Sequence, residues 1–390
     1  MTHLDNPDDF QFLKTQAVKL IRETKLEINS DFKVERIPFR SNGFYFTHDF
    51  WLENNTLIFE SWVETKKVAN VILGKKAILF KAEFEPNAPH VKVTRILPES
   101  LYSNMAVLAW NKEFIVTHFK NEITILSTDD YSVIKNINLD LPPYYRAGQF
   151  SLTSDDKWLM YEVNLNWEIP AAPKRTEIST YMVLQNLENG EIIKFNEKPY
   201  PWMWSHLLCN PCNPNQITSA LVKYTQFGKT EEYEQRLWLS DISIKNSGDI
   251  KTRPLYKQRK KNFFRRAECI THECWGKNGK YLTFIVRRNK IKRVEVATNK
   301  DRIIMNKGPN PWHCDGSFQD WIVFDTMNKD TGIWLGAMDN SKVINLCLQH
   351  TDKNGQMYHP HPFFNKNQSY VFFNADLRDE GHLYRVKTPL

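Results

Sequence analysis

The chain has 390 residues, of which 41% are hydrophobic and 25% charged, and its net charge is +7. This composition is typical of a folded globular protein and excludes a disordered or fibrous chain. Six cysteines are too few for a disulfide scaffold, and no run of roughly 18 uncharged apolar residues is present that could span a membrane.

The first segment of the chain has a different pattern from the rest. Its apolar residues recur at helical spacing: Phe10, Leu13, Ala17, Leu20 and Ile21. This spacing predicts one amphipathic helix from Asp8 to Lys25, within an N-terminal helical extension of residues 1–30. The segment has no apolar stretch typical of a secretory signal, so we expect a cytoplasmic location.

From Asp31 onward, short runs of β-branched and aromatic residues alternate with polar turns. The runs form a repeat of one apolar strand, a polar turn and a second apolar strand, with turns near positions 54, 111, 155, 214, 278, 319 and 365. The mean spacing, about 52 residues, is close to the size of a four-stranded propeller blade. The repeat predicts an all-β fold, a seven-bladed β-propeller forming a single catalytic domain over residues 31–390. Two stacked β-sandwiches would not explain one period along the whole chain.

The last copy of the repeat has only two clear strands after its turn, at 369–374 and 382–387. An open ring would leave unpaired strand edges. We therefore expect an N-terminal strand, from Lys33 to Pro38, to close the last blade.

Histidines mark corresponding places in successive copies. They stand in or just before the first strand of a copy: His206, His272, His313, His359 and His361. Because the first strand of each propeller blade lines the central channel, equivalent positions on neighbouring blades converge at one end of it. The repeat therefore predicts a functional site built from these side chains.

The segment Gln356-Met-Tyr-His359-Pro-His361 is the most specific local pattern. On an extended strand, residues i and i+2 point the same way, so His359 and His361 can bind one ion. Gln356 can add an amide oxygen, and His313 a third imidazole from the previous blade. Such a donor set suits Mn, Fe or Zn rather than Ca or Mg. The alternative is a group of hydrogen-bonded channel histidines without a metal.

His272 has the same repeat phase one blade earlier, where a free imidazole beside a cation could act as a general base. Arg236, in the preceding blade, could hold a carboxylate with two of its guanidinium N–H groups. Glu273 would point away from His272 on a regular strand, and we expect it in a surface or inter-blade ion pair.

The C-terminal half resembles the oligogalacturonate lyases, polysaccharide lyase family 22. The segment from Gln356 to Pro362 matches the family motif Q-x-x-H-P-H-P, and Thr271 to Trp275 resembles T-H-E-F-W. Arg236-Leu-Trp is similar to the motif R-M-W. His313 and His206 match two further channel histidines of the family.

This resemblance implies β-elimination on short 1,4-linked uronides, as in pectin breakdown. It implies that Gln356, His359, His361 and His313 bind Mn²⁺ and that His272 is the catalytic base. Arg236, also assigned a catalytic role, would contact the substrate carboxylate, with His206 and Tyr224 as further substrate-binding residues.

Several alternatives stay open. The basic run from Lys257 to Arg266 could attract an acidic oligosaccharide or be a solvated loop. The chain could be a lyase of the same type acting on another uronate, a non-enzymatic binding or scaffold propeller, or a nucleic-acid binder that uses its basic runs. We expect an anionic oligosaccharide as partner and neither nucleic acid nor a membrane; the sequence leaves the oligomeric state open.

Overall fold

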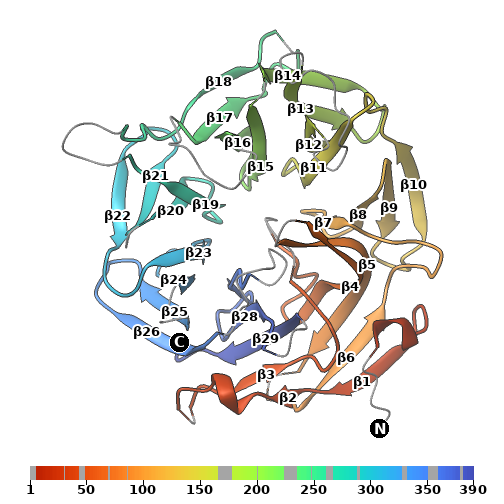
Figure 1. Cartoon of the computed structure of the whole chain (residues 1–390), viewed down its shortest axis with the longest axis vertical. Helices are drawn as coiled ribbons and strands as arrows, with labels where there is room; N and C mark the ends of the chain where they lie inside the picture. The colour runs from red at the N-terminus through yellow and green to blue at the C-terminus, as the bar shows by residue number, and fades with distance from the viewer. Residues whose placement is uncertain are drawn as a thin grey trace.

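The computed structural model describes residues 6–29, 31–43, 49–68, 71–85, 87–165, 178–199, 201–223, 235–246, 248–260, 267–287, 290–326, 332–349, 359–377 and 381–390, with the backbone alone for 65–68 and 71–75. Nearly every described element is a β-strand, and the strands form seven antiparallel sheets around a central axis (Figure 1). The predicted seven-bladed, all-β propeller is confirmed.

Blades 2 to 6 each consist of four consecutive strands, with the first nearest the axis (Figure 1). Blade 2 comprises β7 (Met105–Leu108), β8 (Phe114–Phe119), β9 (Glu122–Ser127) and β10 (Val133–Asn138). Blade 3 comprises β11 (Tyr145–Leu152), β12 (Trp158–Leu165), β13 (Ser179–Asn186) and β14 (Ile192–Pro199). Blade 4 comprises β15 (Trp202–Asn210), β16 (Asn213–Lys223), β17 (Leu237–Asp241) and β18 (Lys251–Pro254).

Blade 5 comprises β19 (Ile270–Trp275), β20 (Tyr281–Val286), β21 (Lys290–Glu295) and β22 (Asp301–Met305). Blade 6 comprises β23 (Pro311–Asp315), β24 (Trp321–Thr326), β25 (Gly332–Ala337) and β26 (Val343–Leu348). In blades 2 to 7, the turns between first and second strands fall within a few residues of the positions predicted from the repeat. In blade 1, the predicted turn near position 54 instead precedes the first strand, β4 (Thr56–Val68).

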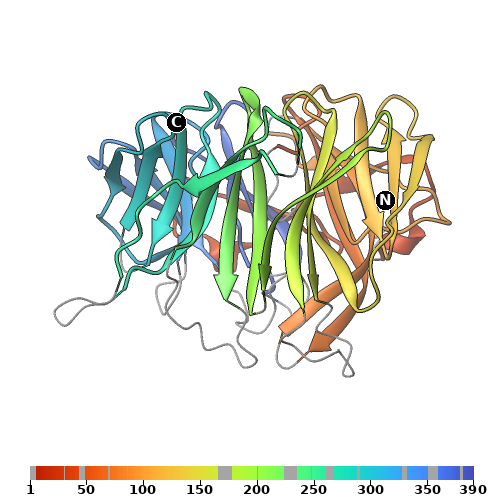
Figure 2. The ribbon, with the colours of Figure 1, turned by 90° about the horizontal axis from the view of Figure 1, so that it is seen from above.

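Blades 1 and 7 combine strands from distant parts of the chain. Blade 1 comprises β4 (Thr56–Val68), β5 (Val71–Phe84), β6 (His90–Arg95) and, at the rim, β1 (Thr15–Lys19). Blade 7 comprises β27 (Phe363–Phe364), β28 (Tyr370–Ala375), β29 (His382–Lys387), β3 (Val34–Arg36) and β2 (Ile21–Arg22). The hairpin of β4 and β5 extends further than its neighbours on one face of the disc (Figure 2).

Strand β3 pairs with β29, with Arg36 opposite Tyr384 and Val34 opposite Val386. The N-terminal part of the chain thus supplies a strand to the last blade, as predicted for the segment from Lys33 to Pro38. This pairing covers the edge of β29 that an unclosed ring would expose.

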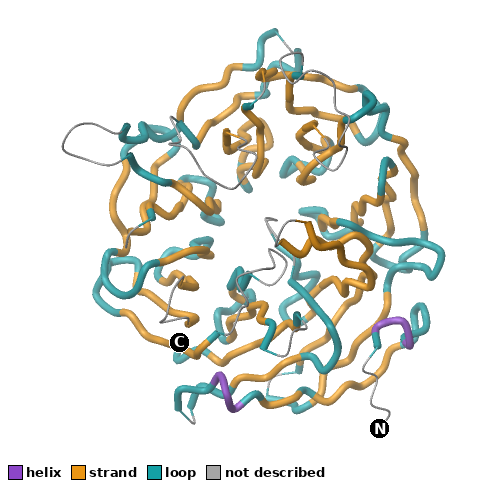
Figure 3. Tube along the Cα trace, viewed as in Figure 1, coloured by secondary structure: helices purple, strands orange, loops and turns teal. Residues whose placement is uncertain are grey.

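The predicted helix from Asp8 to Lys25 is wrong. The segment contains β1 and β2, with two short 3-10 turns at Pro7–Asp9 and Thr24–Leu26 (Figure 3). Strand β1 pairs with β6, and Phe10 packs against Phe39 and Phe80 with ring centroids 4.9 and 5.3 Å apart. An open sheet edge and an aromatic cluster therefore outweigh the helical spacing of the apolar residues.

The core lies between neighbouring blades, because each sheet packs both faces against another sheet. Strand β12 is buried at all eight positions, which explains its nearly continuous apolar sequence. Among the described residues, no helix has the length and apolar character needed to cross a membrane.

Candidate functional site

A cavity of about 600 Å³ lies where the first strands of several blades meet. His272, His313 and His361 line one end of this cavity. Lys277 and Lys366, in the turns that follow the first strands of blades 5 and 7, line the other end. We call this space the central cavity. The candidate functional site lies at its histidine end.

The site histidines occupy irregular places in the sheets. In blades 4, 5 and 6, the register between the first and second strand shifts across His206, His272 and His313. The backbone is left-handed at His206 (φ 56°), His272 (φ 48°) and His361 (φ 40°). A β-bulge takes a side chain out of the regular alternation, and bulges are frequent beside active sites. A left-handed non-glycine residue costs about 1–3 kcal/mol, and such residues cluster at functional sites.

The structure brings the five predicted histidines together. Ring nitrogens of His272, His313 and His361, from blades 5, 6 and 7, lie within 4.8 Å of one another. The ring centroid of His313 is 3.8 Å from that of His361, 4.0 Å from His272 and 5.2 Å from His359. His206 is more distant, with its centroid 6.3 Å from that of His272.

A carboxylate fixes the orientation of His313. The backbone N–H of His313 donates to Asp325 Oδ1 (2.6 Å), and His313 Nδ1 lies 2.5 Å from Asp325 Oδ2. Because the carboxylate accepts a hydrogen bond from Nδ1–H, Nε2 presents its lone pair. His313 Nε2 and His359 Nδ1 are buried without a hydrogen-bond partner among the described residues. Such nitrogens fit a metal ion as the missing partner.

The stretch from His359 to His361 is not a strand, which corrects the prediction that placed these residues on one. Strand β27 begins only at Phe363, and His361 has a left-handed backbone. Pro360 has no N–H to donate to a ladder, although its carbonyl accepts from Asn374 N (2.8 Å). Both imidazoles nevertheless lie beside His313, so they remain compatible with one ion.

Arg236 precedes β17, the third strand of blade 4, and its side chain is only 6% exposed. Arg236 Nη2 lies 3.1 Å from His206 Nδ1 and 3.4 Å from Glu273 Oε1. His206 Nδ1 lies 2.8 Å from the same carboxylate oxygen, and the side chain of Glu273 is fully buried. Glu273 therefore forms an inter-blade ion pair, as expected, and it fixes two predicted site residues.

Blade 3 extends this network. The backbone N–H of His206 donates to Gln149 Oε1 (3.2 Å), and Gln149 N donates to Glu162 Oε1 (3.0 Å). Sequence reasoning missed Gln149 and Asp325 and gave Glu273 no role in the site. A usable signal was present, since Asp325 and Glu273 are charged residues within apolar strands, where a buried charge needs a partner.

Burial controls the charges of the site. It lowers the pKa of His272, His313 and His361 well below that of a free imidazole, and nearby positive charge lowers it further. Burial raises the pKa of Glu273, but Arg236 and His206 outweigh it and bring this pKa to about 2. The site thus combines neutral imidazoles with a buried ion pair. It can bind a divalent metal, accept a proton and hold a carboxylate.

Three predictions fall outside the described residues: Gln356 as a metal ligand, Tyr224 as a substrate contact and the part of the basic run at 261–266.

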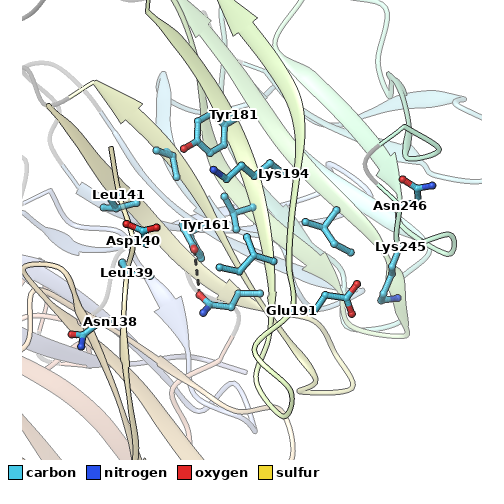
Figure 4. A pocket seen from close by; sticks show the side chains of 15 residues that line it. Asn138, Leu139, Asp140, Leu141, Tyr161, Tyr181, Glu191, Lys194, Lys245 and Asn246 are labelled. Atoms are coloured by element: carbon cyan, nitrogen blue, oxygen red, sulfur yellow. Dashed lines mark hydrogen bonds between the residues drawn. The ribbon is translucent and has the colours of Figure 1, made fainter. Parts of the chain in front are cut away.

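A second hollow of about 700 Å³ lies on the outer part of blades 2 and 3 (Figure 4). Tyr161, Tyr181, Glu191 and Lys194 line it, and Tyr161 donates a hydrogen bond to Gln185 Oε1 (3.2 Å). It is larger than the central cavity, but none of the residues that line it is a histidine. We therefore place the candidate chemistry in the central cavity.

No known family model matches the sequence, and no curated protein matches it. In structure, the chain is similar to an oligogalacturonate lyase in complex with manganese, with a TM-score of 0.74, 15% identity, and coverage of 97% of this chain and 99% of that one. It is also similar to an oligogalacturonate lyase from Vibrio parahaemolyticus, with a TM-score of 0.73, 16% identity, and coverage of 96% and 99%. Over nearly its whole length, the chain has the seven-bladed propeller fold of these two lyases.

Proposed function

We propose that the protein is a metal-dependent lyase that cleaves short 1,4-linked uronides, oligogalacturonate in particular, by β-elimination. One observation carries the proposal: the imidazoles of His272, His313 and His361, from blades 5, 6 and 7, meet at one end of the central cavity. The buried guanidinium of Arg236 contacts the next histidine along the ring, His206. The fold shared with two oligogalacturonate lyases supports it.

His313, His359 and His361 would hold one divalent transition ion, together with Gln356. Neutral imidazoles with an amide oxygen are suitable ligands for such an ion. Mn²⁺ is our first choice, because one of the similar lyases is in complex with manganese. When bound, the ion acts as a Lewis acid that stabilises the negative charge developing beside the substrate carboxylate.

We assign His272 to proton transfer. Its ring lies 4.0 Å from that of His313, so it could also be a ligand. His313, His359 and His361 already supply three nitrogen donors, which leaves His272 to accept the proton from C5 of the uronate on a ring nitrogen. The electron pair of the broken C5–H bond forms the C4–C5 double bond, the C4–O bond breaks, and the leaving sugar oxygen takes a proton from water.

Arg236 would hold the substrate carboxylate with its planar guanidinium. Glu273 fixes this guanidinium from the neighbouring blade, so the cation is positioned before substrate arrives. Such preorganisation lowers the cost of ordering the site during the reaction.

The test is a uronide panel with protein purified without chelator. Elemental analysis should find about one divalent transition ion per chain, and oligogalacturonate should give the ultraviolet absorbance of an unsaturated uronate. Chelation should abolish this signal and Mn²⁺ should restore it. His313→Ala should lose both metal and activity.

Each other outcome has a definite meaning. A metal content near zero that does not change in His359→Ala and His361→Ala would refute the metal site. Activity only on a glucuronate- or iduronate-containing oligomer would show that the proposed substrate is wrong and that the proposed β-elimination is right. Binding without any unsaturated product would identify a non-enzymatic propeller.

A further inference from the structure

The central cavity has a second end, formed by the turns between the first and second strands. Lys277 and Lys366 line the cavity there, with the aromatic side chains of Trp110 and Phe318. None of these four residues has a part in the proposed lyase chemistry.

Lysines recur at this end in the same repeat phase. Lys112, Lys277 and Lys366 each lie in the turn that joins the first and second strands of blades 2, 5 and 7. In antiparallel blades these turns all lie on one face of the ring, opposite the second-to-third-strand turns. Three lysines from separated blades therefore lie on one face of the ring, and Lys277 and Lys366 line the cavity there.

The carboxylates at this mouth already have partners. Asp49 Oδ2 lies 3.1 Å from Lys112 Nζ, and Asp49 Oδ1 accepts from Trp51 N (3.0 Å). Asp315 accepts from the backbone N–H groups of Ser317 (2.9 Å) and Phe364 (3.0 Å). Both carboxylates line the central cavity beside the lysines, but the hydrogen bonds and the ion pair described for them are to other groups.

Lys277 and Lys366 lack such a partner. Lys366 Nζ donates only to the Leu52 carbonyl (3.4 Å), and Lys277 Nζ lies 3.8 Å from the centroid of the Phe318 ring. Within the part of the chain that the structure describes, neither ammonium has a carboxylate in ion-pair range. Burial lowers the pKa of both Lys112 and Lys277, whereas the nearby carboxylate of Asp49 raises both and that of Asp315 raises the pKa of Lys277. The charge of Lys366 lowers both. A bound anion would relieve this loss of solvation and this repulsion.

We propose that this end of the central cavity binds a small organic carboxylate of the size of one sugar acid. Lys277 and Lys366 hold the carboxylate, and Trp110 and Phe318 pack against the apolar face of the ring. Charge-assisted hydrogen bonds to the carboxylate supply the affinity, and the aromatic walls favour a ring-shaped ligand. The lysines and aromatic walls indicate an anion site that goes beyond the proposed lyase function, whereas the choice of a sugar acid as its ligand rests on that function.

The test is isothermal titration calorimetry with galacturonate monomer, using chelator-treated protein so that the histidine end holds no metal. We expect saturable binding that Lys277→Met and Lys366→Met each weaken about tenfold, the loss of one good charged contact. Lys280→Met is the matched control, since Lys280 is exposed and does not line the cavity, and it should bind as the wild type does. His313→Ala should also retain binding.

The proposal is overturned if the protein shows no saturable binding, or if Lys277→Met and Lys366→Met variants with unchanged thermal unfolding bind normally. Loss of binding in His313→Ala would place the carboxylate at the histidine end instead. Equal binding of galactose would refute recognition of the charge. None of these readouts measures lyase activity, so failure here would leave the proposed function untouched.

Discussion

The first strands of blades 2 and 5 occupy the same place in the ring but have different roles. Strand β7 pairs with β8 without interruption, from Met105 opposite His118 to Leu108 opposite Ile115, and its side chains fill the core. The pairing of β19 with β20 shifts at His272. One extra residue, at His272, is thus the difference between β19, which carries a site residue, and the regular strand β7, which only fills the core. The candidate site is therefore built on a rigid sheet.

Blade 3 is an intermediate case. The pairing of β11 with β12 also shifts, between Ala147 and Phe150, but the strand carries no histidine. Its irregular stretch instead contains Gln149, which accepts from the backbone of His206. Gln149 of blade 3 and Glu273 of blade 5 therefore both support His206 of blade 4, one from each side.

The largest expected effect tests the site strand directly. His272→Ala should lower turnover by roughly 10²–10⁴-fold, the usual loss for a general base, and should leave the metal content unchanged. Leu108→Ala on β7 is the matched scaffold change; it should cost about 2–5 kcal/mol of unfolding free energy with turnover per folded molecule unchanged. Steady-state kinetics measures turnover, elemental analysis measures the metal content, and urea unfolding measures the unfolding free energy. An emptied metal site in His272→Ala would make this residue a ligand.

The buried ion pair should give the next largest effect. Glu273→Gln keeps the side-chain shape but leaves Arg236 buried without its counter-charge, which should cost about 3 kcal/mol of unfolding free energy and reduce turnover. Arg236→Lys keeps the charge but loses the planar fork, so it should lower turnover with a smaller loss of stability. Urea unfolding and steady-state kinetics on both variants distinguish a loss of stability from a loss of turnover. Equal stability of Glu273→Gln and wild type would contradict a positioning role.

The buried His118, on β8 of the regular blade 2, should make the unfolding free energy depend on pH. Burial lowers its pKa to about 4, below the value of about 6.5 in an unfolded chain. The unfolded chain therefore takes up the proton first, so the stability is complete above about pH 6.5 and falls by about 3 kcal/mol as the pH drops to about 4. His118→Gln should flatten this part of the stability curve in urea titrations at several pH values. An unchanged slope would show that other groups cause the acid loss.

The smallest effect should come from the basic run. Lys257 and Lys260 are exposed, so they act through a diffuse field that salt screens. Lys257→Gln with Lys260→Gln should raise KM for an anionic substrate a few-fold at low salt and leave kcat unchanged. Kinetics at low and high ionic strength decide this. An increase in KM of the same size at low and high salt would indicate that these lysines contact the substrate directly.

The ring was predictable because its signals are local and repeated. A polar turn recurs once per blade, and in six of the seven blades it joins the first and second strands. The N-terminal segment was not predictable in the same way. Its residues fit a helix by spacing, but their structure depends on β6, about 75 residues away.

The site was predictable only in part, for a related reason. The repeat phase of the histidines indicated that they would meet, and they do. The bulges depend on the register between two strands, which the sequence of one strand does not contain. Asp325 and Glu273, as charged residues within apolar strands, indicated buried contacts, but which histidine each one contacts depends on that register.

The closing pair of β3 and β29 has a consequence for how the protein is made. Arg36 Nη1 lies 3.2 Å from His382 Nδ1, and 346 residues separate the two in sequence. During synthesis, β3 can pair with β2 on one edge, but its other edge has no partner until β29 has left the ribosome. Contacts of such long range slow folding and expose strand edges meanwhile. Blade 7, which carries His361, should thus be the last part of the protein to mature, and a nascent chain stalled short of β29 should be a preferred client of chaperones.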